Sequence, residues 1–294
     1  MTTQIIRNTE GVIQVGNFCQ FGVRKKTNTG GGGEIPSNEM HFTTTSGALS
    51  YLGNSGDIIT LSDNTSYTVL EDGEYSNENI PAGKHKVQLV VERSDGYVGI
   101  DGEALIELHN FPSLVGVTQF DFCPNTGSPN LVKVPTTLPS NITDISYMFN
   151  RALSFNQDIS MWDTSKVTDM SEMLSQTSSF NQSLNTWDVS KVTSMEGMFR
   201  LSESFNQPLV NWNTSKVINM HSMFEGAGNF NQDISSWNVS NVVEMDWMFA
   251  NASAFNQDLS QWCVSLIVEK PSYFNYDDSA LTPEHLPVWG TCPV

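Results

Sequence analysis

Side chains that commonly do chemistry are sparse in this chain and do not converge. No H-x-x-x-H or H-E-x-x-H frame contains any of the five histidines, which are His41, His85, His109, His221 and His285. The glycine run at residues 30–33 is not followed by the Lys-Ser/Thr pair of a phosphate-binding loop. An enzyme needs a convergent nucleophile, acid or metal, so we predict that the chain is not an enzyme and has no cofactor, metal or catalytic residue.

Two carboxylates have a spacing that could hold a cation. Asp163 and Asp188 are 25 residues apart, and stacked coils of that length would bring them to roughly 5 Å from each other. A shared cation such as calcium is therefore an alternative at this point. The equivalent positions further along the chain are Asn213, Asn238 and Cys263, so the carboxylates do not continue as a row, and we predict no metal site.

These carboxylates belong to a 25-residue repeat, which is the strongest signal in the sequence. Five copies follow one another without an insertion, and a copy this short cannot bury both of its faces unless its neighbours stack on it. The recurring large residues are Phe155, Phe180, Phe205, Phe230 and Phe255, each followed by Asn-Gln, together with Trp162, Trp187, Trp212, Trp237 and Trp262, and Met148, Met173, Met198, Met223 and Met248.

Each copy predicts one coil of a solenoid. The apolar positions from Ile159 to Val167 fit the leucine-rich-repeat pattern, which places a short strand at Trp162–Thr164. From Val167 to Leu174 the apolar residues follow the spacing of one helix face. The predicted fold class is a β-rich, leucine-rich-repeat-like right-handed solenoid of short parallel strands and short helices, with a β-rich region before it. The Trp, Met and Phe columns would fill its core.

The Asn-Gln pairs predict a structural feature first. Inside a solenoid, stacked side-chain amides can satisfy inward-facing backbone groups from coil to coil, so we expect an inward amide ladder. The alternative is a row of exposed amides that binds the hydroxyl groups of a sugar.

The repeat unit also resembles a known family. Phe155 to Leu174 reads Phe-Asn-Gln-Asp-Ile-Ser-Met-Trp-Asp-Thr-Ser-Lys-Val-Thr-Asp-Met-Ser-Glu-Met-Leu, which is similar to the BspA-type leucine-rich repeat of bacterial surface proteins. The resemblance covers about residues 141–276. It implies display on a cell surface and binding to host proteins or other cells, and such repeats also occur in protist and viral proteins.

Four segments are predicted along the chain. Residues 1–40 are a basic N-terminal arm with a glycine-rich linker, residues 41–130 a β-rich region, residues 131–276 the solenoid and residues 277–294 its C-terminal cap. The β-rich region contains four apolar stretches separated by glycine-bearing turns, at residues 57–61, 67–70, 86–91 and 104–108. These stretches fit a separate domain and an extension of the solenoid equally well.

Charge separates the arm from the rest of the chain. With 14 Lys+Arg and 32 Asp+Glu the net charge is −18, which argues against general attraction to nucleic acid or anionic lipid. Residues 1–33 carry four basic residues against Glu10, a net charge of +3. Arg24, Lys25 and Lys26 are the candidate anchor, which would dock on an acidic protein partner or on a second copy of the chain. The alternative is a solvated tail. No apolar run approaches the ~20 residues of a membrane span, so we predict no membrane insertion.

The predicted strand face is the candidate binding face. Alternation along the strands would turn small polar side chains outward in rows, a flat surface suited to a protein or glycan ligand. No aromatic or arginine stands there as an anchor, so the soluble face of a mere spacer is the alternative. The candidate residues are Asp163, Thr186, Asp188, Asn211, Asn213, Ser236 and Asn238.

Two of the four cysteines flank the C-terminal segment. A disulfide between Cys263 and Cys292 would fasten that segment to the last repeat. The cysteines show no pairing pattern, however, and free thiols are the prediction.

In the absence of catalytic chemistry, the sequence predicts a structural and recognition protein displayed on a surface. The first residues lack the charged and apolar regions of a secretory signal. The first expectation is a virion decoration or fibre component on the virion surface, anchored by its arm with the repeats exposed. The alternative is a cell-surface or secreted bacterial adhesin that binds host proteins or glycans.

Overall fold

The structure is a computed structural model that describes residues 5–8, 11–14, 39–53, 57–61, 64, 66–68, 73–88, 97–102, 105–108, 111, 118–121 and 127–293. The chain divides into two compact units, residues 1–135 and residues 136–294. The division into four segments made from the sequence stays a prediction. The candidate anchor, Arg24, Lys25 and Lys26, lies outside the described residues.

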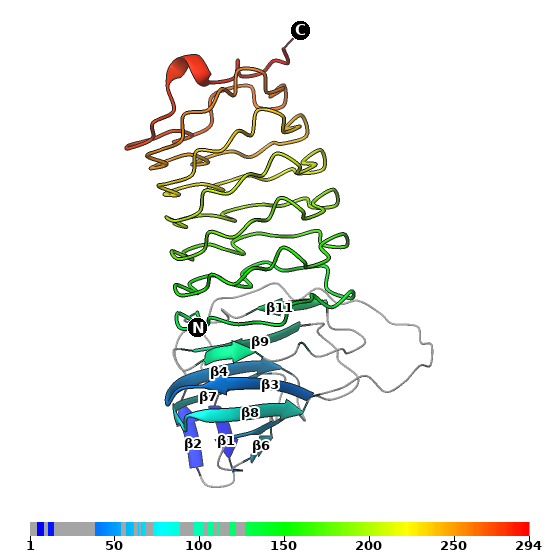
Figure 1. The fold of residues 1–294 in the computed structure, drawn as a ribbon, viewed down its shortest axis with the longest axis vertical. Coiled ribbons are helices and arrows are strands. Elements are labelled where there is room, and N and C mark those ends of the chain that lie inside the picture. The colour runs from blue at the N-terminus through cyan, green and yellow to red at the C-terminus, as the bar shows by residue number, and fades with distance from the viewer. Residues whose placement is uncertain are drawn as a thin grey trace. The chain divides into compact units, whose positions relative to one another are not determined.

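The described strands of the first unit form three sheets (Figure 1). The five-stranded sheet has the order β10-β3-β8-β5-β6, with β3 at Glu39–Thr44, β5 at Ile58–Thr60, β6 at Ser66–Thr68, β8 at Gly83–Gln88 and β10 at Leu105–Leu108. The four-stranded sheet has the order β11-β9-β4-β7, with β4 at Gly47–Gly53, β7 at Gly73–Ile80, β9 at Tyr97–Asp101 and β11 at Gln119–Asp121. A hairpin pairs β1 (Ile5–Asn8) with β2 (Gly11–Gln14). All of these pairs are antiparallel except β11 with β9.

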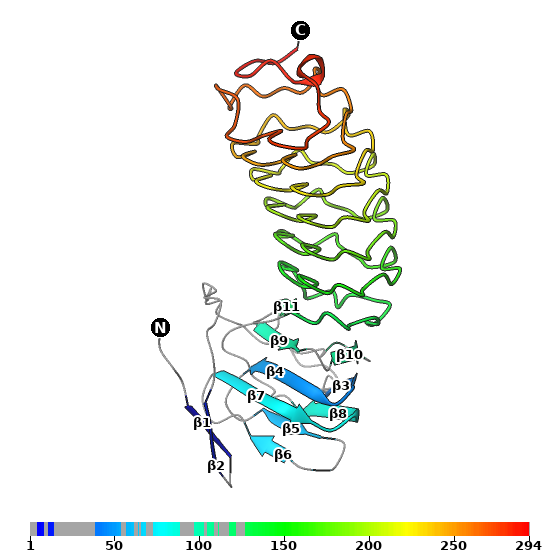
Figure 2. The same ribbon diagram turned by 90° about the vertical axis from the view of Figure 1, so that its left-hand side faces the viewer.

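Side chains from both larger sheets supply the core of this unit. In β3, Met40, Phe42 and Thr44 are buried at every second position, the period of a strand with one buried face. In the other sheet Figure 2 shows β4 between β9 and β7, and Tyr51 of β4 is buried. The buried His85 has a polar partner, since its Nε2 lies 2.7 Å from Oγ1 of Thr44.

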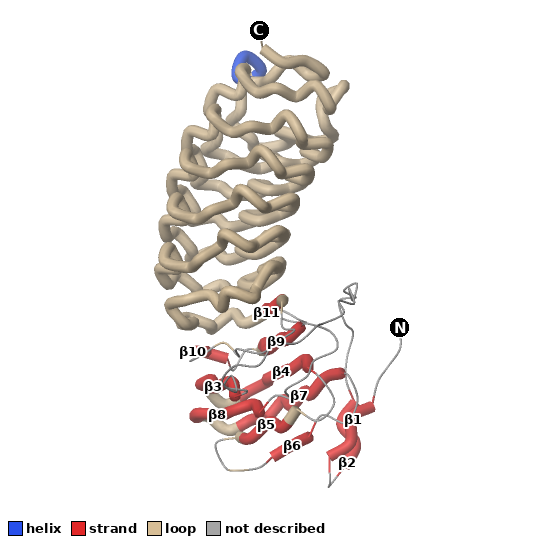
Figure 3. Tube along the Cα trace, turned by 90° about the vertical axis from the view of Figure 1, so that its right-hand side faces the viewer, coloured by secondary structure: helices blue, strands red, loops and turns tan. Residues whose placement is uncertain are grey.

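The second unit is a stack of 25-residue coils made of turns (Figure 3). In the first repeat the N–H groups of residues 145, 147, 149 and 151 donate to the carbonyls of residues 169, 171, 173 and 175 in the next coil. Between them, the N–H groups of Met148 and Asn150 donate to carbonyls three residues back in their own coil, and that of Ser146 donates to Oδ1 of Asp144 at 2.9 Å. This alternation pairs the backbone both along a coil and between coils.

The predicted fold class is wrong. The strands of the described residues lie in the mainly antiparallel sheets of the first unit, and the repeats meet through single-residue parallel bridges, as at Asp169. No strand forms at Trp162–Thr164 and no helix at residues 167–174. Within residues 127–293 the one helix is the 3-10 turn Pro283–His285. The repeats are therefore not a leucine-rich-repeat-like right-handed solenoid of parallel strands and helices. Separately, none of the described helices is long and apolar enough to cross a membrane.

Two local causes replace the expected strand and helix by turns. Oδ1 of Asp163 accepts the N–H of Ser165 at 3.0 Å, which folds the backbone into a turn at the place of the strand. In the expected helix, Glu172 has a φ of 54°, a left-handed conformation that a right-handed helix cannot contain. Val167 and Met170 are buried all the same, because successive turns bring them to the same side of the coil.

The predicted core columns of the repeat are confirmed. The five Phe residues and the five Met residues are 0% exposed, and the five Trp residues are at most 4% exposed. Rings of neighbouring coils stack, with centroids 5.8 Å apart for Phe155 and Phe180 and 6.0 Å apart for Trp212 and Trp237. The buried indole N–H of Trp212 donates to the carbonyl of Leu184 at 2.9 Å. The core is therefore both close-packed and hydrogen-bonded.

The Asn-Gln pairs form the predicted amide ladder. Oδ1 of Asn181 accepts two hydrogen bonds from the next coil, from the N–H of Asn206 and from Nε2 of Gln207, both at 3.0 Å. The same two bonds recur at Asn156, Asn206 and Asn231. Asn181 is exposed, so the ladder runs along the surface of the coils and not inside them as expected, and it ties each coil to the next.

The C-terminal segment closes the last repeat. Oδ1 of Asn256 accepts the N–H of Thr282 at 3.1 Å and lies 2.9 Å from Nδ1 of His285, so these two residues replace the Asn and Gln of a further coil. Cys263 and Cys292 are joined by a disulfide. The prediction of free thiols is therefore wrong, because the closing segment brings together two cysteines that are 29 residues apart.

Candidate binding face

The residues of the predicted binding face are exposed, but they lie in turns and irregular segments and none lies in a strand. Oδ1 of Asp163, Asp188, Asn213 and Asn238 accepts the N–H of the serine two residues further on in each case. Thr186 donates from Oγ1 to the carbonyl of Ser160 at 2.9 Å. These polar atoms hold the backbone of the coils. Thr186, Asn211 and Ser236 lie in one turn of each coil, and Asp163, Asp188, Asn213 and Asn238 lie in the irregular segment that follows it.

Hydrogen bonding fixes the charge of the two carboxylates on this face. The hydroxyl and the backbone N–H of Ser165 hold the pKa of Asp163 below its usual value. Those of Ser190, with a smaller contribution from the charge of Lys191, lower the pKa of Asp188 in the same way. Both side chains are therefore ionised at neutral pH and serve the turns. Within the part of the chain that the structure describes, no group of three or more Asp, Glu, His or Cys residues could hold a metal ion.

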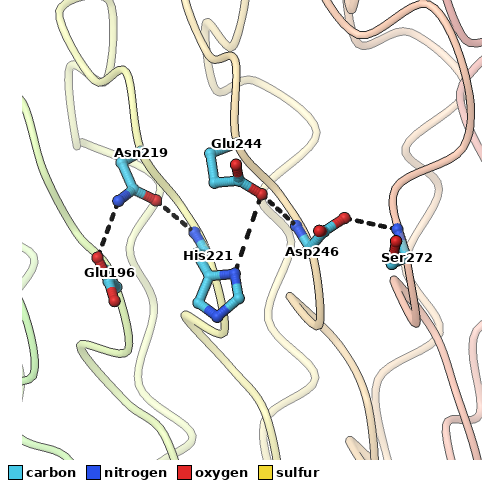
Figure 4. Close-up of polar contacts among 6 residues, drawn as sticks. All are labelled: Glu196, Asn219, His221, Glu244, Asp246 and Ser272. Atoms are coloured by element: carbon cyan, nitrogen blue, oxygen red, sulfur yellow. Dashed lines mark hydrogen bonds and ion pairs between the residues drawn. The ribbon is translucent and has the colours of Figure 1, made fainter.

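A second surface carries more varied side chains. We call it the bridge face, and it comprises the segments that contain the inter-coil bridges: residues 144–151, 169–176, 194–201, 219–226 and 244–251. A chain of polar contacts crosses the bridge face from coil to coil (Figure 4). Nδ2 of Asn219 donates to Oε2 of Glu196 in the preceding coil at 3.0 Å, and Oδ1 of Asn219 accepts the N–H of His221 at 2.8 Å.

The chain of contacts continues towards the C-terminal end of the stack. Nδ1 of His221 lies 3.9 Å from Oε1 of Glu244, which also accepts the N–H of Asp246 at 3.4 Å. Oδ1 of Asp246 accepts the N–H of Ser272 at 2.5 Å. Carboxylates and one imidazole thus stand in a row, each oriented by its neighbours (Figure 4). Such a row offers a partner fixed hydrogen-bond acceptors and negative charge.

Further charged side chains of the bridge face lie around Arg200. Nε of Arg200 is 2.9 Å from Oε2 of Glu225. Oε2 of Glu172 accepts a hydrogen bond from Nδ2 of Asn150 at 3.0 Å. Burial raises the pKa of the Glu172 carboxyl, and the charge of Arg200 opposes that rise. The bridge face therefore holds charges that are partly withdrawn from water.

Two positions in each coil of the bridge face have a left-handed backbone. They are the equivalents of Tyr147 and Arg151, whose φ angles are 60° and 61°. Ten residues share this conformation across the five coils, and of these only Gly197 and Gly226 are glycines. For other residues the left-handed conformation costs roughly 1–2 kcal/mol. Eight side chains are therefore held where glycine would be more stable.

Side chains of the bridge face also differ most between coils. The equivalents of Tyr147 are Tyr, Glu, Gly, Ser and Trp, and those of Asn150 are Asn, Ser, Arg, Glu and Ala. On the predicted face, the equivalents of Ser165 are serine in every coil. The only position of that face that varies as widely as the bridge face is that of Met161, whose equivalents are Met, Thr, Asn, Ser and Gln. Positions that serve the fold keep one residue type, so the copies have diverged mainly on the bridge face.

Sequence reasoning missed the bridge face although a signal was present. Its positions are those at which the aligned copies agree least, whereas the prediction looked for rows of like residues. Rows of like residues such as Asp163 and Asp188 prove to be turn formers.

The stacked coils thus define a repeat protein whose copies differ mainly on one face. The chain belongs to the family described as Mycoplasma protein of unknown function, DUF285. The match falls on residues 130–227 and 185–283, two overlapping stretches that together cover more than half of the 294 residues. No curated protein and no solved structure matches the chain.

Proposed function

We propose that the chain is a non-enzymatic recognition protein, displayed on a surface, that binds a partner through the bridge face. The left-handed residues carry this proposal. Eight side chains other than glycine occupy these positions, and backbone strain of this kind is retained where the side chain serves a function. The divergence of the same positions between coils supports the proposal, because a partner can contact each coil differently.

The partner class follows from the extent and chemistry of the bridge face. Stacked repeats present an extended surface rather than a closed pocket. Polar contacts run across it from Glu196 to Ser272 through successive coils (Figure 4). A protein or a glycan chain can contact several coils at once, so we propose a partner of one of these two kinds.

The setting of the proposed display has two forms. The disulfide between Cys263 and Cys292 supports exposure outside a reducing cytosol. A virion decoration or fibre component and a cell-surface or secreted bacterial adhesin both meet that condition. The similarity of the repeat unit to the BspA-type repeat and the membership of a family described from Mycoplasma support the bacterial adhesin.

The N-terminal arm is proposed to fasten the chain at that surface. Arg24, Lys25 and Lys26 are three of its basic residues in a chain of net charge −18, so they would contact an acidic protein partner or a second copy. Replacing all three by Glu is expected to release the chain from its assembly and leave the coils folded, measured by fractionation and circular dichroism. Unchanged attachment would contradict this role.

Recognition is tested by exchanging strained side chains for glycine. One variant changes Arg151, Gln176 and Asn251 to Gly, and the control changes Thr186 and Asn211 of the predicted face to Ala. The probes are an immobilised panel of purified extracellular proteins and a glycan array. We expect the glycine variant to be at least as stable as the native chain in thermal unfolding. It should bind the protein or glycan that the native chain binds at least tenfold more weakly, while the control variant binds it with the affinity of the native chain.

Two results would decide against the proposal. A glycine variant that binds like the native chain, or a loss of binding confined to the control, would remove the bridge face as the binding surface. The setting is decided by the mass and copy number of the native assembly, since a symmetric particle supports the virion component and recovery with the cell envelope supports the adhesin.

A further inference from the structure

Three aromatic side chains gather at the C-terminal end of the bridge face. The ring of Trp247 stacks on that of Tyr273 with centroids 4.2 Å apart. Tyr276 lies edge-on to both rings, 5.0 Å from Tyr273 and 6.2 Å from Trp247. Tyr273 is 50% and Tyr276 is 52% exposed. The aromatic columns of the repeat are almost fully buried, so the cluster stands apart from the core.

The register of the last coil places two of the rings at equivalent positions. The N–H of Trp247 donates to the carbonyl of Ser272, 25 residues on, whereas the N–H of Ser222 donates to that of Asp246, 24 residues on, so the last coil contains one extra residue. Tyr273 is therefore the equivalent of Trp247, and the buried Phe274 takes the place of Met248. Trp247 and Tyr273 both have a left-handed backbone, with φ of 63° and 56°. Exposed apolar area and a left-handed backbone both disfavour aromatic residues. Stability therefore gives no reason for these rings, and a ligand that covers them would.

Carboxylates flank the cluster. Asp246 is held by the N–H of Ser272 at 2.5 Å, and Asp277 and Asp278 are exposed. Residues 244–278 include six acidic residues and one basic residue. Asp246, Asp277 and Asp278 adjoin the cluster in contact or in sequence, and their negative charge repels anionic ligands and attracts cations.

We propose that the cluster of Trp247, Tyr273 and Tyr276, with its flanking carboxylates, anchors an arginine-bearing segment of a protein partner. This inference rests on the proposed function, because it names the partner class of the same face. A guanidinium is planar and weakly hydrated, so it can stack on a ring while its N–H groups pair with a carboxylate. Lysine has a compact, strongly hydrated ammonium, and a neutral sugar can donate hydrogen bonds to the carboxylates but brings no positive charge to balance them.

The test measures the binding of two fluorescent peptides to the full chain at about 0.15 M salt. Both peptides are Gly/Ser-rich, and they carry four arginines or four lysines. The native chain is expected to bind the arginine peptide about tenfold more tightly than the lysine peptide. The variant Tyr273→Ser/Tyr276→Ser is expected to lose about tenfold in affinity for the arginine peptide, since two cation–π contacts are removed.

Matched variants separate the rings from charge and folding. The Ser variant keeps the net charge of −18, so non-specific attraction to cationic peptides is the same. Tyr273→Phe/Tyr276→Phe keeps both rings and is expected to bind like the native chain. Val210→Ser removes another half-exposed apolar side chain, and binding should not change.

Several outcomes would overturn the inference. The native chain could bind the two peptides with equal affinity, or the native chain and the Ser variant could bind the arginine peptide with equal affinity. Either result would mean that net charge, and not the rings, causes the binding. Ring-dependent binding of a neutral glycan without binding of the arginine peptide would replace the partner class and leave the bridge face as a recognition surface. If the glycine variant described above keeps its binding while the Ser variant loses the arginine peptide, the proposed function fails and the cluster still binds arginine.

Discussion

Gly226 is one of the two left-handed positions of the bridge face that hold glycine. Its φ is 65°, and a Cβ added there would lie 2.5 Å from Cδ2 of Leu201 in the preceding coil. Gly226→Ala is expected to lower the free energy of unfolding by about 1–2 kcal/mol or more, measured in urea. At Gly228 a Cβ would meet only Oγ of Ser253 at 3.6 Å, so Gly228→Ala is the control and should be neutral. Equal losses in the two variants would contradict the backbone argument.

Glu172 makes stability depend on pH. Burial raises the pKa of its carboxyl in the folded state above the usual 4.5, so the fold binds this proton more tightly than the unfolded chain does. Its ionisation therefore costs stability above the folded pKa, and the cost disappears as the pH falls below the unfolded value. Glu172→Gln is expected to stabilise the chain at neutral pH and to have no effect below about pH 4.5.

The opposite sign is expected for Asp188, whose carboxylate pKa is lowered by Ser190. Asp188→Asn should destabilise at neutral pH and lose its effect in acid, as the folded carboxyl becomes protonated. Thermal unfolding across the pH range measures both variants. Destabilisation by Glu172→Gln at neutral pH would show that burial does not dominate at that residue.

Within a coil, the tryptophan of the core contributes both stacking and a hydrogen bond. Trp212 is 4% exposed and donates its indole N–H to the carbonyl of Leu184. Trp212→Ala is expected to cost about 3–5 kcal/mol in denaturant unfolding. Trp212→Phe keeps a ring and loses this hydrogen bond, but the carbonyl of Leu184 still accepts the N–H of Trp187 at 3.1 Å, so a smaller cost of about 0.5–1.5 kcal/mol is expected. A loss below about 1 kcal/mol for Ala would place the column outside the core.

The columns of the coil could be predicted from the sequence, but the path of its backbone could not. Side-chain size and a fixed period identify the Phe, Trp and Met columns and the amide ladder directly. Apolar spacing from Val167 to Leu174 does not report φ, and a series of turns buries the same residues as a helix would. The left-handed Glu172 leaves no trace in hydrophobic periodicity.

The strands of the first unit show the same limit. Apolar stretches predict segments that overlap β5, β6, β8 and β10. Strand β7 reads Gly-Glu-Tyr-Ser-Asn-Glu-Asn-Ile and has little apolar content, so neither propensity nor alternation indicates it. Its extended conformation is set by pairing with β4, which the sequence does not show.

The candidate site was predicted on the wrong segment of the coil for a related reason. Asp163 and its equivalents form an even polar row, which resembles a surface prepared for a ligand. Their oxygens are the acceptors of the turns instead. Identifying the bridge face required the φ angles, because these show which side chains are retained against backbone preference.

Across the whole molecule, the disulfide should stabilise one end and not the other. It joins residues 29 apart, and closing a loop of that length in the unfolded chain raises the free energy of unfolding by roughly 3–4 kcal/mol. Each coil contacts only its neighbours, so Cys292→Ser is expected to speed amide hydrogen exchange in residues 259–291 and to leave residues 155–205 unchanged. Reduction of the native chain should reproduce this pattern. An equal increase along all coils would show that the stack unfolds as one unit.

Each coil of the stack offers the next coil the same acceptors, so the repeat by itself sets no limit to its own continuation. The limit comes from the C-terminal segment. Thr282 donates its N–H to Oδ1 of Asn256, which also lies within hydrogen-bond distance of His285. The N–H of Val264 donates to the carbonyl of Thr291. A chain truncated before Thr282 would expose those groups to another molecule, and two open ends of this kind can associate with each other.

We therefore expect the truncated chain to self-associate, with a mean molar mass in light scattering that rises with concentration, while the full chain at the same concentration keeps one mass. Residues 282–291 would then act as a plug that prevents each stack from accepting a foreign coil. A truncated chain that remains monomeric would contradict this.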